Sequence, residues 1–444
     1  MYGRWKNYIW FSKRRLVFWE DKIQTTEKFF KKKIDISNLI NQEARELKSF
    51  FDSIGYNLWI VGGAVRDHVL GIEIHDIDFT TDGNPEEILK YIDDSKFSIQ
   101  TNAKKYGCLT FIKNEKHFQV TTLRQDMKNY GRDVEVKFTE KINEDVKRRD
   151  FTINSLYLNF SGELYDPLDA FRDIIDQRII FIGDVKKRII EDHLRILRYL
   201  RFVAKFGYHA IKDRELQVCI DNKDLLLKLS KERVRDEILN FISCIKSKEI
   251  IEVLSVPTFF NVIGIKLNDF SHINKFHSIR ERVEFDISII FQFALALDKN
   301  QNIKDYEAMF ENLKFSRKDS IFIQEILDFR VYSKKEMSQK IDLLIYKHGI
   351  EMTKYIIINS WIFDDDPSEF DNWSFLFKSI DNQTKMVFPI KPDHLIKIGI
   401  YPGPDISRIL KDLENIWIDK NFEPSFKDLI KLAEQELPTN NRGE

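Results

Sequence analysis

A short apolar run that ends in a glycine pair, with two aspartates close behind it, constrains the fold of this chain most strongly. Residues 58–61 predict a buried strand, the glycine pair a tight turn, and residues 64–70 a helix. Asp76 and Asp78 follow in an alternating stretch. They are two residues apart, so on an extended strand both carboxylates point to the same face of the sheet. The order of strand, turn, helix and acid pair predicts a charged binding site at one edge of a sheet.

The acid pair indicates a cation site, because two neighbouring carboxylates repel each other unless a cation lies between them. Mg²⁺ typically takes one or two carboxylates and completes its shell with water and substrate phosphates. Gly62 and Gly63 allow the backbone to approach a phosphate closely, and Arg66 supplies a planar cationic fork for it. An Asp-x-Asp sequence alone is common in surface loops, so the prediction rests on the three features together.

Hydrophobic periodicity changes about 180 residues into the chain. Before that point, helical spacing at residues 38–55 is followed by strand patterns at 108–113, 117–123 and 134–138 and a predicted hairpin around residues 161–162. After it, apolar residues recur every three or four positions to the end. We therefore predict an α+β head with a mixed sheet, followed by an all-α neck, body and tail. The predicted parts are a basic extension at 1–37, the head at 38–178, the neck at 179–254, and the body and tail at 255–444.

Composition narrows the class of partner. The 444 residues carry 70 Lys and Arg against 71 Asp and Glu, a net charge of -1, so a nucleic acid would have to meet local basic patches. No apolar run reaches about 18 residues, which predicts no membrane span. The three cysteines are far apart in the sequence and predict neither a disulfide framework nor a zinc site, which favours a reducing compartment.

The N-terminus permits two interpretations. Residues 1–19 hold five basic side chains and no acid before Glu20. One interpretation is a basic extension on a cytoplasmic protein. The other is a transit peptide for mitochondria or another organelle, although such peptides are usually Ser-rich and this segment is aromatic.

Two further polar groups are candidates for nucleotide contacts. Arg148, Arg149 and Asn154 lie close together near a helix start, where they form either a triphosphate or ribose clamp or a solvated charge cluster. Residues 191–202 predict one strong helix with a polar ridge formed by Asp192, Arg195, Arg198 and Arg201. An aspartate beside an arginine offers acceptors and donors in one plane, which suits the Watson–Crick edge of a base. An ordinary amphipathic surface helix is the alternative.

Three segments together resemble the signature of the class II tRNA nucleotidyltransferases and bacterial poly(A) polymerases, which belong to the polymerase-β-like nucleotidyltransferases. The segments are Gly62-Gly63-Ala64-Val65-Arg66-Asp67, Leu70-Gly71 and Asp76-Ile77-Asp78-Phe79-Thr80. The resemblance implies that Arg149 contacts the nucleotide with support from Asn154. It implies that Asp192 and Arg195 select CTP and ATP by reading the base, and that Arg198 and Arg201 are adjacent nucleotide or hinge contacts.

The resemblance also implies an activity: template-independent addition of CMP, CMP and AMP to the 3′ end of tRNA, with release of pyrophosphate. Asp76 and Asp78 would be the catalytic residues and would hold Mg²⁺, and the helical body and tail would bind the acceptor arm of tRNA. A poly(A) polymerase, an enzyme that adds only CC and an inactive RNA-binding protein are the alternatives. The sequence does not indicate an oligomeric state.

Three features differ from the family pattern or bear on its details. Gln119 stands where family members usually have a third acid, and Gln accepts a hydrogen bond but cannot act as a base. Asp169 and Ala170 replace glycines in a motif that joins head to neck. Residues 125–147 match a region that contains a flexible loop needed for the final A, and their length favours complete CCA addition.

Overall fold

The computed structural model describes residues 33–435, apart from residue 75 and residues 93–95, 131–132, 208–209, 269 and 367–368. Most of the basic extension expected at residues 1–37 therefore lies outside the described residues. The described chain forms two compact units. The first runs to Leu267 and includes Gln301–Lys314; the second comprises Asn268–Asn300 and the chain from Phe315 onward. The four-part division expected from the sequence is finer than this and stays a prediction.

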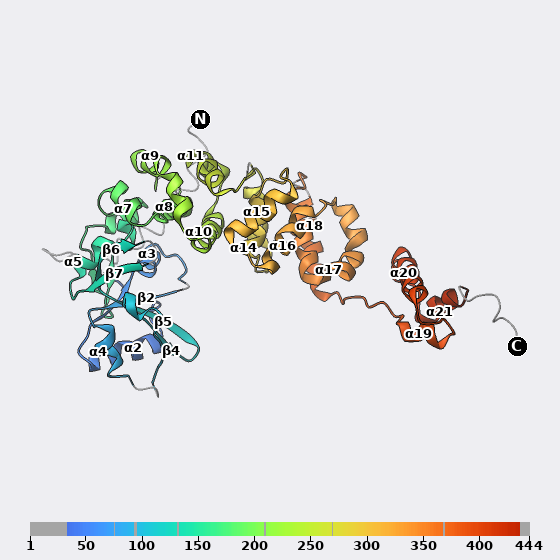
Figure 1. The fold of residues 1–444 in the computed structure, drawn as a ribbon, viewed down its shortest axis with the longest axis horizontal. Coiled ribbons are helices and arrows are strands. Elements are labelled where there is room, and N and C mark those ends of the chain that lie inside the picture. The colour runs from blue at the N-terminus through green and yellow to red at the C-terminus, as the bar shows by residue number, and fades with distance from the viewer. Residues whose placement is uncertain are drawn as a thin grey trace. The chain divides into compact units, whose positions relative to one another are not determined.

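A mixed seven-stranded sheet is the framework of the first unit (Figure 1). All neighbouring strands are antiparallel except β2 and β5, which run parallel. In spatial order the strands are β3 (Ser98–Gln100), β4 (Cys108–Lys113), β5 (Lys116–Thr122), β2 (Asp78–Thr81), β1 (Leu58–Val61), β8 (Tyr157–Leu158) and β9 (Leu164–Tyr165). The mixed sheet confirms the predicted α+β head, and β4 has the predicted bounds.

Two helices flank the first strand in the sequence. Helix α2 (Gln42–Ser53) begins where the Asn41 side chain accepts a hydrogen bond from the Ala44 backbone N–H. Its buried Phe51 packs against Phe111 of β4, with ring centroids 5.6 Å apart. Helix α3 (Gly63–Val69) follows β1 directly, as the glycine pair predicted.

The region expected to contain a flexible loop includes a two-stranded antiparallel hairpin. Its strands are β6 (Arg124–Tyr130) and β7 (Asp133–Phe138), and the register shifts between Asp126 and Lys128. A short helix, α5 (Ile142–Asp145), follows the hairpin. The alternating residues near 134–138 thus form a strand as predicted, but β6, which pairs with it, was not foreseen.

The remaining elements of the first unit are mainly helices. The α-helices are α4 (Pro85–Leu89), α6 (Phe171–Ile175), α7 (Val185–Glu191), α8 (Arg195–Phe206), α9 (Asp213–Asp221), α10 (Lys231–Cys244), α11 (Lys248–Val253), α12 (Val256–Phe260) and α15 (Ile303–Leu313). The prediction of one helix over residues 191–202 is wrong, because α7 ends and α8 begins within this range. Asp192 is extended at φ -145° and ψ 105°, and its carboxylate accepts a hydrogen bond from the Leu194 N–H, which competes with helical bonding.

In the second unit, the described residues form helices and no named strand, which agrees with the predicted all-α body and tail (Figure 1). They are α13 (Ile273–Arg282), α14 (Ile289–Ala296), α16 (Arg317–Asp328), α17 (Lys334–Ile362), α18 (Phe370–Ser379), α19 (Pro392–Lys397), α20 (Pro404–Asp419) and α21 (Phe426–Gln435). Helix α17 is interrupted at Gly349, which has φ 81°. None of the described helices is long and apolar enough to cross a membrane.

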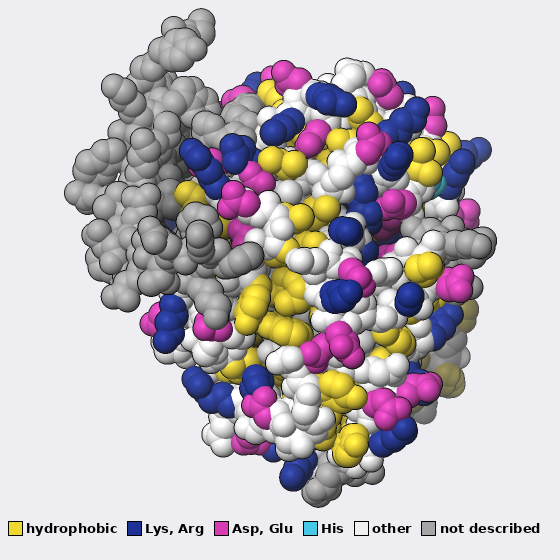
Figure 2. Space-filling view, turned by 90° about the vertical axis from the view of Figure 1, so that its left-hand side faces the viewer, with side chains coloured by type: hydrophobic (Ala, Val, Ile, Leu, Met, Phe, Trp, Pro, Cys, Tyr) yellow, Lys and Arg dark blue, Asp and Glu magenta, His cyan; other side chains and the backbone are white. Residues whose placement is uncertain are grey.

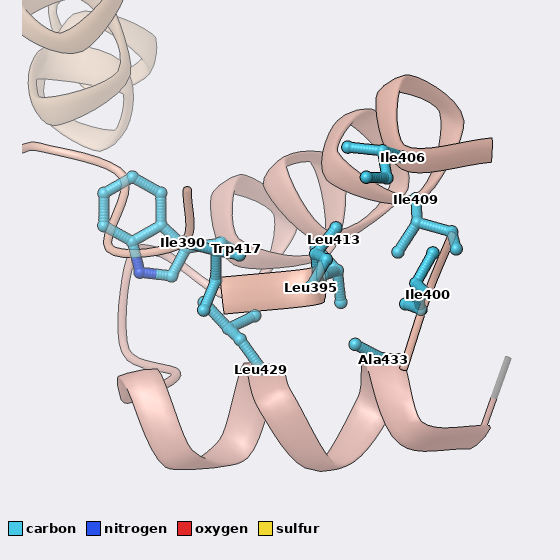
Figure 3. Packing of buried hydrophobic residues seen from close by; sticks show 9 residues of the cluster. All are labelled: Ile390, Leu395, Ile400, Ile406, Ile409, Leu413, Trp417, Leu429 and Ala433. Atoms are coloured by element: carbon cyan, nitrogen blue, oxygen red, sulfur yellow. The ribbon is translucent and has the colours of Figure 1, made fainter. Parts of the chain in front are cut away.

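The last three helices share a small core of their own (Figure 3). Trp417 and Leu413 of α20 lie with Leu395 of α19 and Leu429 of α21 in one buried cluster. The helices of this tail are amphipathic, so their opposite faces stay polar. On the face of the molecule in Figure 2, Lys and Arg side chains are interspersed with Asp and Glu, as expected for a net charge of -1.

Candidate active site

The glycine turn after β1 has a backbone shape that requires glycine. Gly62 has φ 72° and ψ -129°, a conformation that L side chains rarely adopt. A Cβ atom at Gly62 would lie 3.8 Å from Nη1 of Arg149. The turn therefore brings the backbone next to the arginine that was predicted to contact the nucleotide.

Asp78 is the first residue of β2 and lies between two strands. It is opposite Val61 of β1 on one side and opposite Gln119 of β5 on the other. Residues directly opposite one another in a sheet share a face, so Asp78 and Gln119 belong to the same face. Asp76 precedes the strand, so the prediction that both aspartates lie on one strand is wrong for Asp76.

The electrostatics of Asp78 place two charged groups close to it. Loss of solvent around the carboxylate raises the pKa of Asp78. The positive charge of Arg149 opposes this rise, and the negative charge of Asp76 adds to it. Asp76 and Asp78 are both exposed, as residues that receive a ligand must be. The structure thus brings together the two predicted acids and Arg149, although only Asp78 is held within the sheet.

The residues around Asp78 fit a hard divalent cation. Among the described residues no group of three or more His, Cys, Asp or Glu side chains could hold a metal. Gln119 is exposed, and its Nε2 lies 3.2 Å from Sγ of Cys108. Asp76 and Asp78 are exposed carboxylates, and carboxylate oxygens are the ligands that a hard divalent cation takes from protein.

The Arg149 guanidinium binds the carboxylate of Asp145, a residue that the sequence analysis did not identify. Its Nε and Nη2 donate to Oδ2 of Asp145 at 3.1 and 3.0 Å, and Nε also donates to the Tyr157 hydroxyl at 2.9 Å. The guanidinium carbon lies 4.9 Å from the centre of the Tyr157 ring. Asp145 and Arg149 are four residues apart and Asp145 lies in a short helix, a spacing from which this ion pair could have been predicted.

Arg66 is buried between α3 and α8. Its Nη1 donates to Oδ1 of Asn154 at 2.5 Å, its Nε and Nη2 donate to Asp67 at 2.8 and 2.9 Å, and its guanidinium lies over the ring of Phe202 at 5.1 Å. The sequence predicted an Arg66 guanidinium available to a phosphate, but in the structure it donates to Asp67 and Asn154 instead. Arg66 links the two helices, and its direct contact with a phosphate stays a prediction.

The predicted residues Arg66, Asn154 and Arg198 belong to one polar network. Asn154 donates to Oδ1 of Asp150 at 3.0 Å, and Arg198 donates to Oδ2 at 2.8 and 2.6 Å. Burial alone would raise the pKa of Asp150, but Arg198 and Asn154 lower it to about 2. Arg201 pairs with Glu237 of α10, which also lies 4.0 Å from Arg198. Asp150 and Glu237 thus connect the sheet region to α8 and α10, and neither was singled out from the sequence.

Asp192 and Arg195 do not pair with each other. Asp192 forms an ion pair with Arg233 at 3.0 Å. Arg195 is buried, where its Nη1 donates to Glu191 at 2.9 Å and its Nη2 to the Arg148 carbonyl at 3.0 Å. The expected single plane of donors and acceptors is therefore absent here, because the helix break at residue 192 separates the two side chains. Their role as base readers stays a prediction.

Asp169, one of the two residues that replace family glycines, has φ 53°. This left-handed conformation is one that glycine adopts freely and that aspartate tolerates better than most residues. The backbone at this position therefore keeps a shape suited to glycine without containing one.

Comparisons with known proteins agree with this fold. Residues 58–180 match the Poly A polymerase head domain. The mouse mitochondrial CCA tRNA nucleotidyltransferase 1 is 26% identical over 412 residues, which cover 90% of this chain and 92% of that protein.

Solved structures share the fold. The Bacillus stearothermophilus CCA-adding enzyme in complex with CTP has a TM-score of 0.68 at 21% identity and covers 89% of this chain and 96% of its own. The Thermotoga maritima CCA-adding enzyme complexed with tRNA has a TM-score of 0.57 at 20% identity, with coverages of 91% and 97%. Residues 58–180 are therefore similar to the head domain of poly(A) polymerases, and nearly the whole chain is similar to CCA tRNA nucleotidyltransferases in sequence and to CCA-adding enzymes in fold.

Proposed function

We propose that this chain adds CMP, CMP and AMP to the 3′ end of tRNA, using CTP and ATP and releasing pyrophosphate. The observation that carries the proposal is geometric. Asp78 lies opposite Val61, the residue before the Gly62 turn, and Nη1 of Arg149 lies 3.8 Å from the position of a Cβ at Gly62. The relative and solved neighbours named above support the choice of reaction, since their names state CCA addition and their titles include CTP and tRNA.

In the proposed reaction the chain mainly positions charge. Asp76 and Asp78 would hold Mg²⁺, which supplies Lewis acidity to the triphosphate and to the attacking 3′-hydroxyl when bound. Arg149 would direct Nη1 to the triphosphate beside the Gly62 turn, where no side chain intervenes. Gln119 lies beside Asp78 but cannot remove a proton, so the chain supplies no third carboxylate at that position.

Base selection is proposed for Asp192 and Arg195. Asp192 pairs with Arg233, and Arg195 pairs with Glu191 and also donates to the Arg148 carbonyl. The two charged partners can be exchanged for polar groups on a base edge. Direct contact with the base would then require these ion pairs to open when a nucleotide binds. Arg198 and Arg201 would hold α8 in place through their ion pairs with Asp150 and Glu237, rather than contact the nucleotide.

The acceptor arm and 3′ end of tRNA are the proposed RNA partner of the helical part. Basic side chains are exposed on the tail that begins at α19. They are Lys391, Lys397, Arg408, Lys411, Lys420, Lys427 and Lys431. RNA helices are recognised largely through shape and phosphate contacts, which such side chains can provide.

Poly(A) polymerase is the second candidate, because the matching family description names that activity. Incorporation of labelled CTP or ATP into tRNA transcripts that end before CCA, after C and after CC separates the candidates. CCA addition predicts C, C and one A, lost in Asp76→Ala. A long A tail on any RNA would assign a poly(A) polymerase, and a stop after CC would assign a CC-adding enzyme. No incorporation by the wild type would refute the proposal.

A cytoplasmic location is proposed on the sequence grounds given above. Some relatives are mitochondrial by name, so an organelle is the alternative. A fluorescent fusion to the C-terminus, imaged in the cells of origin, distinguishes the two locations.

A further inference from the structure

Asp145 is a fully buried carboxylate that accepts hydrogen bonds from four different residues. Oδ1 receives the Arg124 backbone N–H at 3.0 Å and Nε of Arg148 at 2.7 Å. Oδ2 receives two N–H groups of Arg149 and the Tyr157 hydroxyl, the latter at 2.7 Å. Neither oxygen is left without donors, so the side chain is fixed in orientation.

Asp145 is ionised and binds two arginines. Burial alone would raise the pKa of this carboxyl, but Arg149 and Arg148 lower it to about 2, so Asp145 stays ionised. Its Oδ1 accepts from Arg148 and its Oδ2 from Arg149, so each guanidinium is held by one carboxylate oxygen. The N–H groups of Arg149 that Asp145 and Tyr157 do not use suit an anionic ligand such as a phosphate chain.

The orientation of Arg149 follows from this arrangement. Its Nε and Nη2 are occupied by Asp145 and Tyr157, whereas Nη1 is the atom nearest to the position that a Cβ of Gly62 would take. Arg149 is also close enough to Asp78 to influence its pKa. Asp145 and Tyr157 therefore hold Nε and Nη2 of Arg149, while Nη1 lies beside the glycine turn.

We propose that Asp145 is a positioning residue for the triphosphate of the incoming nucleotide and acts through Arg149. The inference rests on the proposed function, since it needs a nucleotide at the Gly62 turn. Asparagine cannot replace Asp145, because its amide would direct N–H groups toward donors that need acceptors. Because the triphosphate is common to both substrates, loss of Asp145 would weaken CTP and ATP equally.

A double-mutant cycle on nucleotide binding tests this proposal. Binding of CTP and of ATP would be measured by calorimetry on the full chain with Ca²⁺ present and without RNA, for wild type, D145N, R149K and the double variant. R149K keeps the charge but loses the two-pronged geometry. We expect D145N to weaken both nucleotides about tenfold, and to weaken them less than about twofold further in the R149K background.

Two further variants separate positioning from folding. Tyr157→Phe removes only one hydroxyl from Asp145 and should weaken both nucleotides about threefold without unfolding the chain. Asp173→Asn removes another buried carboxylate that pairs with an arginine, Arg178 at 2.7 Å, and should lower Tm while leaving nucleotide binding unchanged.

The outcomes distinguish the inference from the proposed function. Failure of the wild type to bind either nucleotide would refute the function itself. Normal binding by wild type, D145N and Tyr157→Phe alike would overturn the role of Asp145. Losses that add fully in the D145N/R149K variant, or that affect CTP and ATP differently, would also overturn it, because Asp145 would then not act through Arg149 on the triphosphate.

Discussion

Asp150 connects residues that were predicted to contact the nucleotide, although it was not itself predicted as a contact. It accepts hydrogen bonds from Asn154 and an ion pair from Arg198, and Asn154 in turn accepts from Arg66. Two residues that the sequence predicted as nucleotide contacts thus meet at the Asp150 carboxylate, and a third, Arg66, is linked to it through Asn154. Their sequence pattern identified the right neighbourhood, but hydrogen-bonding direction and burial, which decide whether a side chain faces ligand or protein, become visible only in the fold.

Replacement of Asp150 by asparagine should therefore act on stability. It leaves the Arg198 guanidinium partly buried without its carboxylate, which costs about 3 kcal/mol in comparable buried pairs. We expect the free energy of unfolding, measured by chemical denaturation, to fall by about this amount. Asp371→Asn, which breaks an exposed ion pair with Arg282, should change it by less than about 1 kcal/mol. Equal effects of the two substitutions would contradict the network.

Glu215 predicts a pH dependence of stability. Its side chain is buried on α9, Oε2 has no hydrogen-bond partner, and burial raises its pKa from its usual 4.5 to about 7. Between these two values the folded chain binds more protons at this site than the unfolded chain, so this site lowers stability as pH rises from about 4.5 to 7.

Glu215→Gln should remove this penalty, because the neutral amide cannot ionise. Thermal unfolding of wild type and variant would be compared at pH 5 and pH 8. We expect the Tm of the variant, relative to wild type, to be more favourable at pH 8 than at pH 5. A difference that does not depend on pH would show that Glu215 is not protonated in the folded state near neutrality.

At the scale of elements, the sequence predicted regular structure best where one period dominates. The bounds of β4 and the start of α3 after the glycine pair agree with the pattern, because alternation and turn chemistry act locally. The break between α7 and α8 was missed, since residues 191–202 keep a helical pattern throughout. There a side-chain hydrogen bond from the Leu194 N–H to Asp192 overrides periodicity.

Strand β6 was missed for a different reason, whereas its partner β7 was predicted from its alternating residues. The polar residues of β6 give little period-two contrast, and the strand is bulged between Asp126 and Lys128. Register in such strands depends on pairing and on the ends of the hairpin rather than on a buried face. The Arg124 N–H that begins β6 is bound by Asp145, a contact that links positions 21 residues apart.

The turn between β1 and α3 supplies a prediction with an internal control. Gly62 and Gly55 have positive φ values of 72° and 80°, so alanine at either site should cost about 1 kcal/mol of stability. A Cβ at Gly62 meets Arg149, whereas one at Gly55 meets nothing within 4 Å. We expect only Gly62→Ala to reduce nucleotide incorporation, by about tenfold or more. Equal loss of incorporation in both variants would place the triphosphate elsewhere.

At the scale of the whole molecule, charge is balanced but locally arranged. The net charge is -1, and on the tail helices α19 to α21 exposed basic side chains stand beside exposed acids such as Asp393, Asp412 and Asp428. Each phosphate contact releases counterions, so tRNA binding by this part should weaken steeply with salt. The sequence predicted the need for local basic side chains but could not say which of them bind RNA, because helical periodicity identifies the solvent-facing side of a helix but not the partner that meets it.

The salt dependence of tRNA affinity can therefore be compared between the wild type and a variant that lacks tail lysines. Raising salt from 50 to 200 mM should weaken tRNA binding at least tenfold, as fluorescence anisotropy would report. Replacement of Lys420, Lys427 and Lys431 by alanine should reduce the slope of log affinity against log salt. A slope unchanged by these substitutions would exclude the tail from the RNA contact.

The most direct test of the central claim is a crystal structure of the chain with Mn²⁺ and a non-hydrolysable CTP analogue. We predict an anomalous signal between Asp76 and Asp78, and a triphosphate between the Gly62 turn and Nη1 of Arg149. A nucleotide bound away from this turn, or a metal held without either aspartate, would contradict the assignment of this sheet face as the active site.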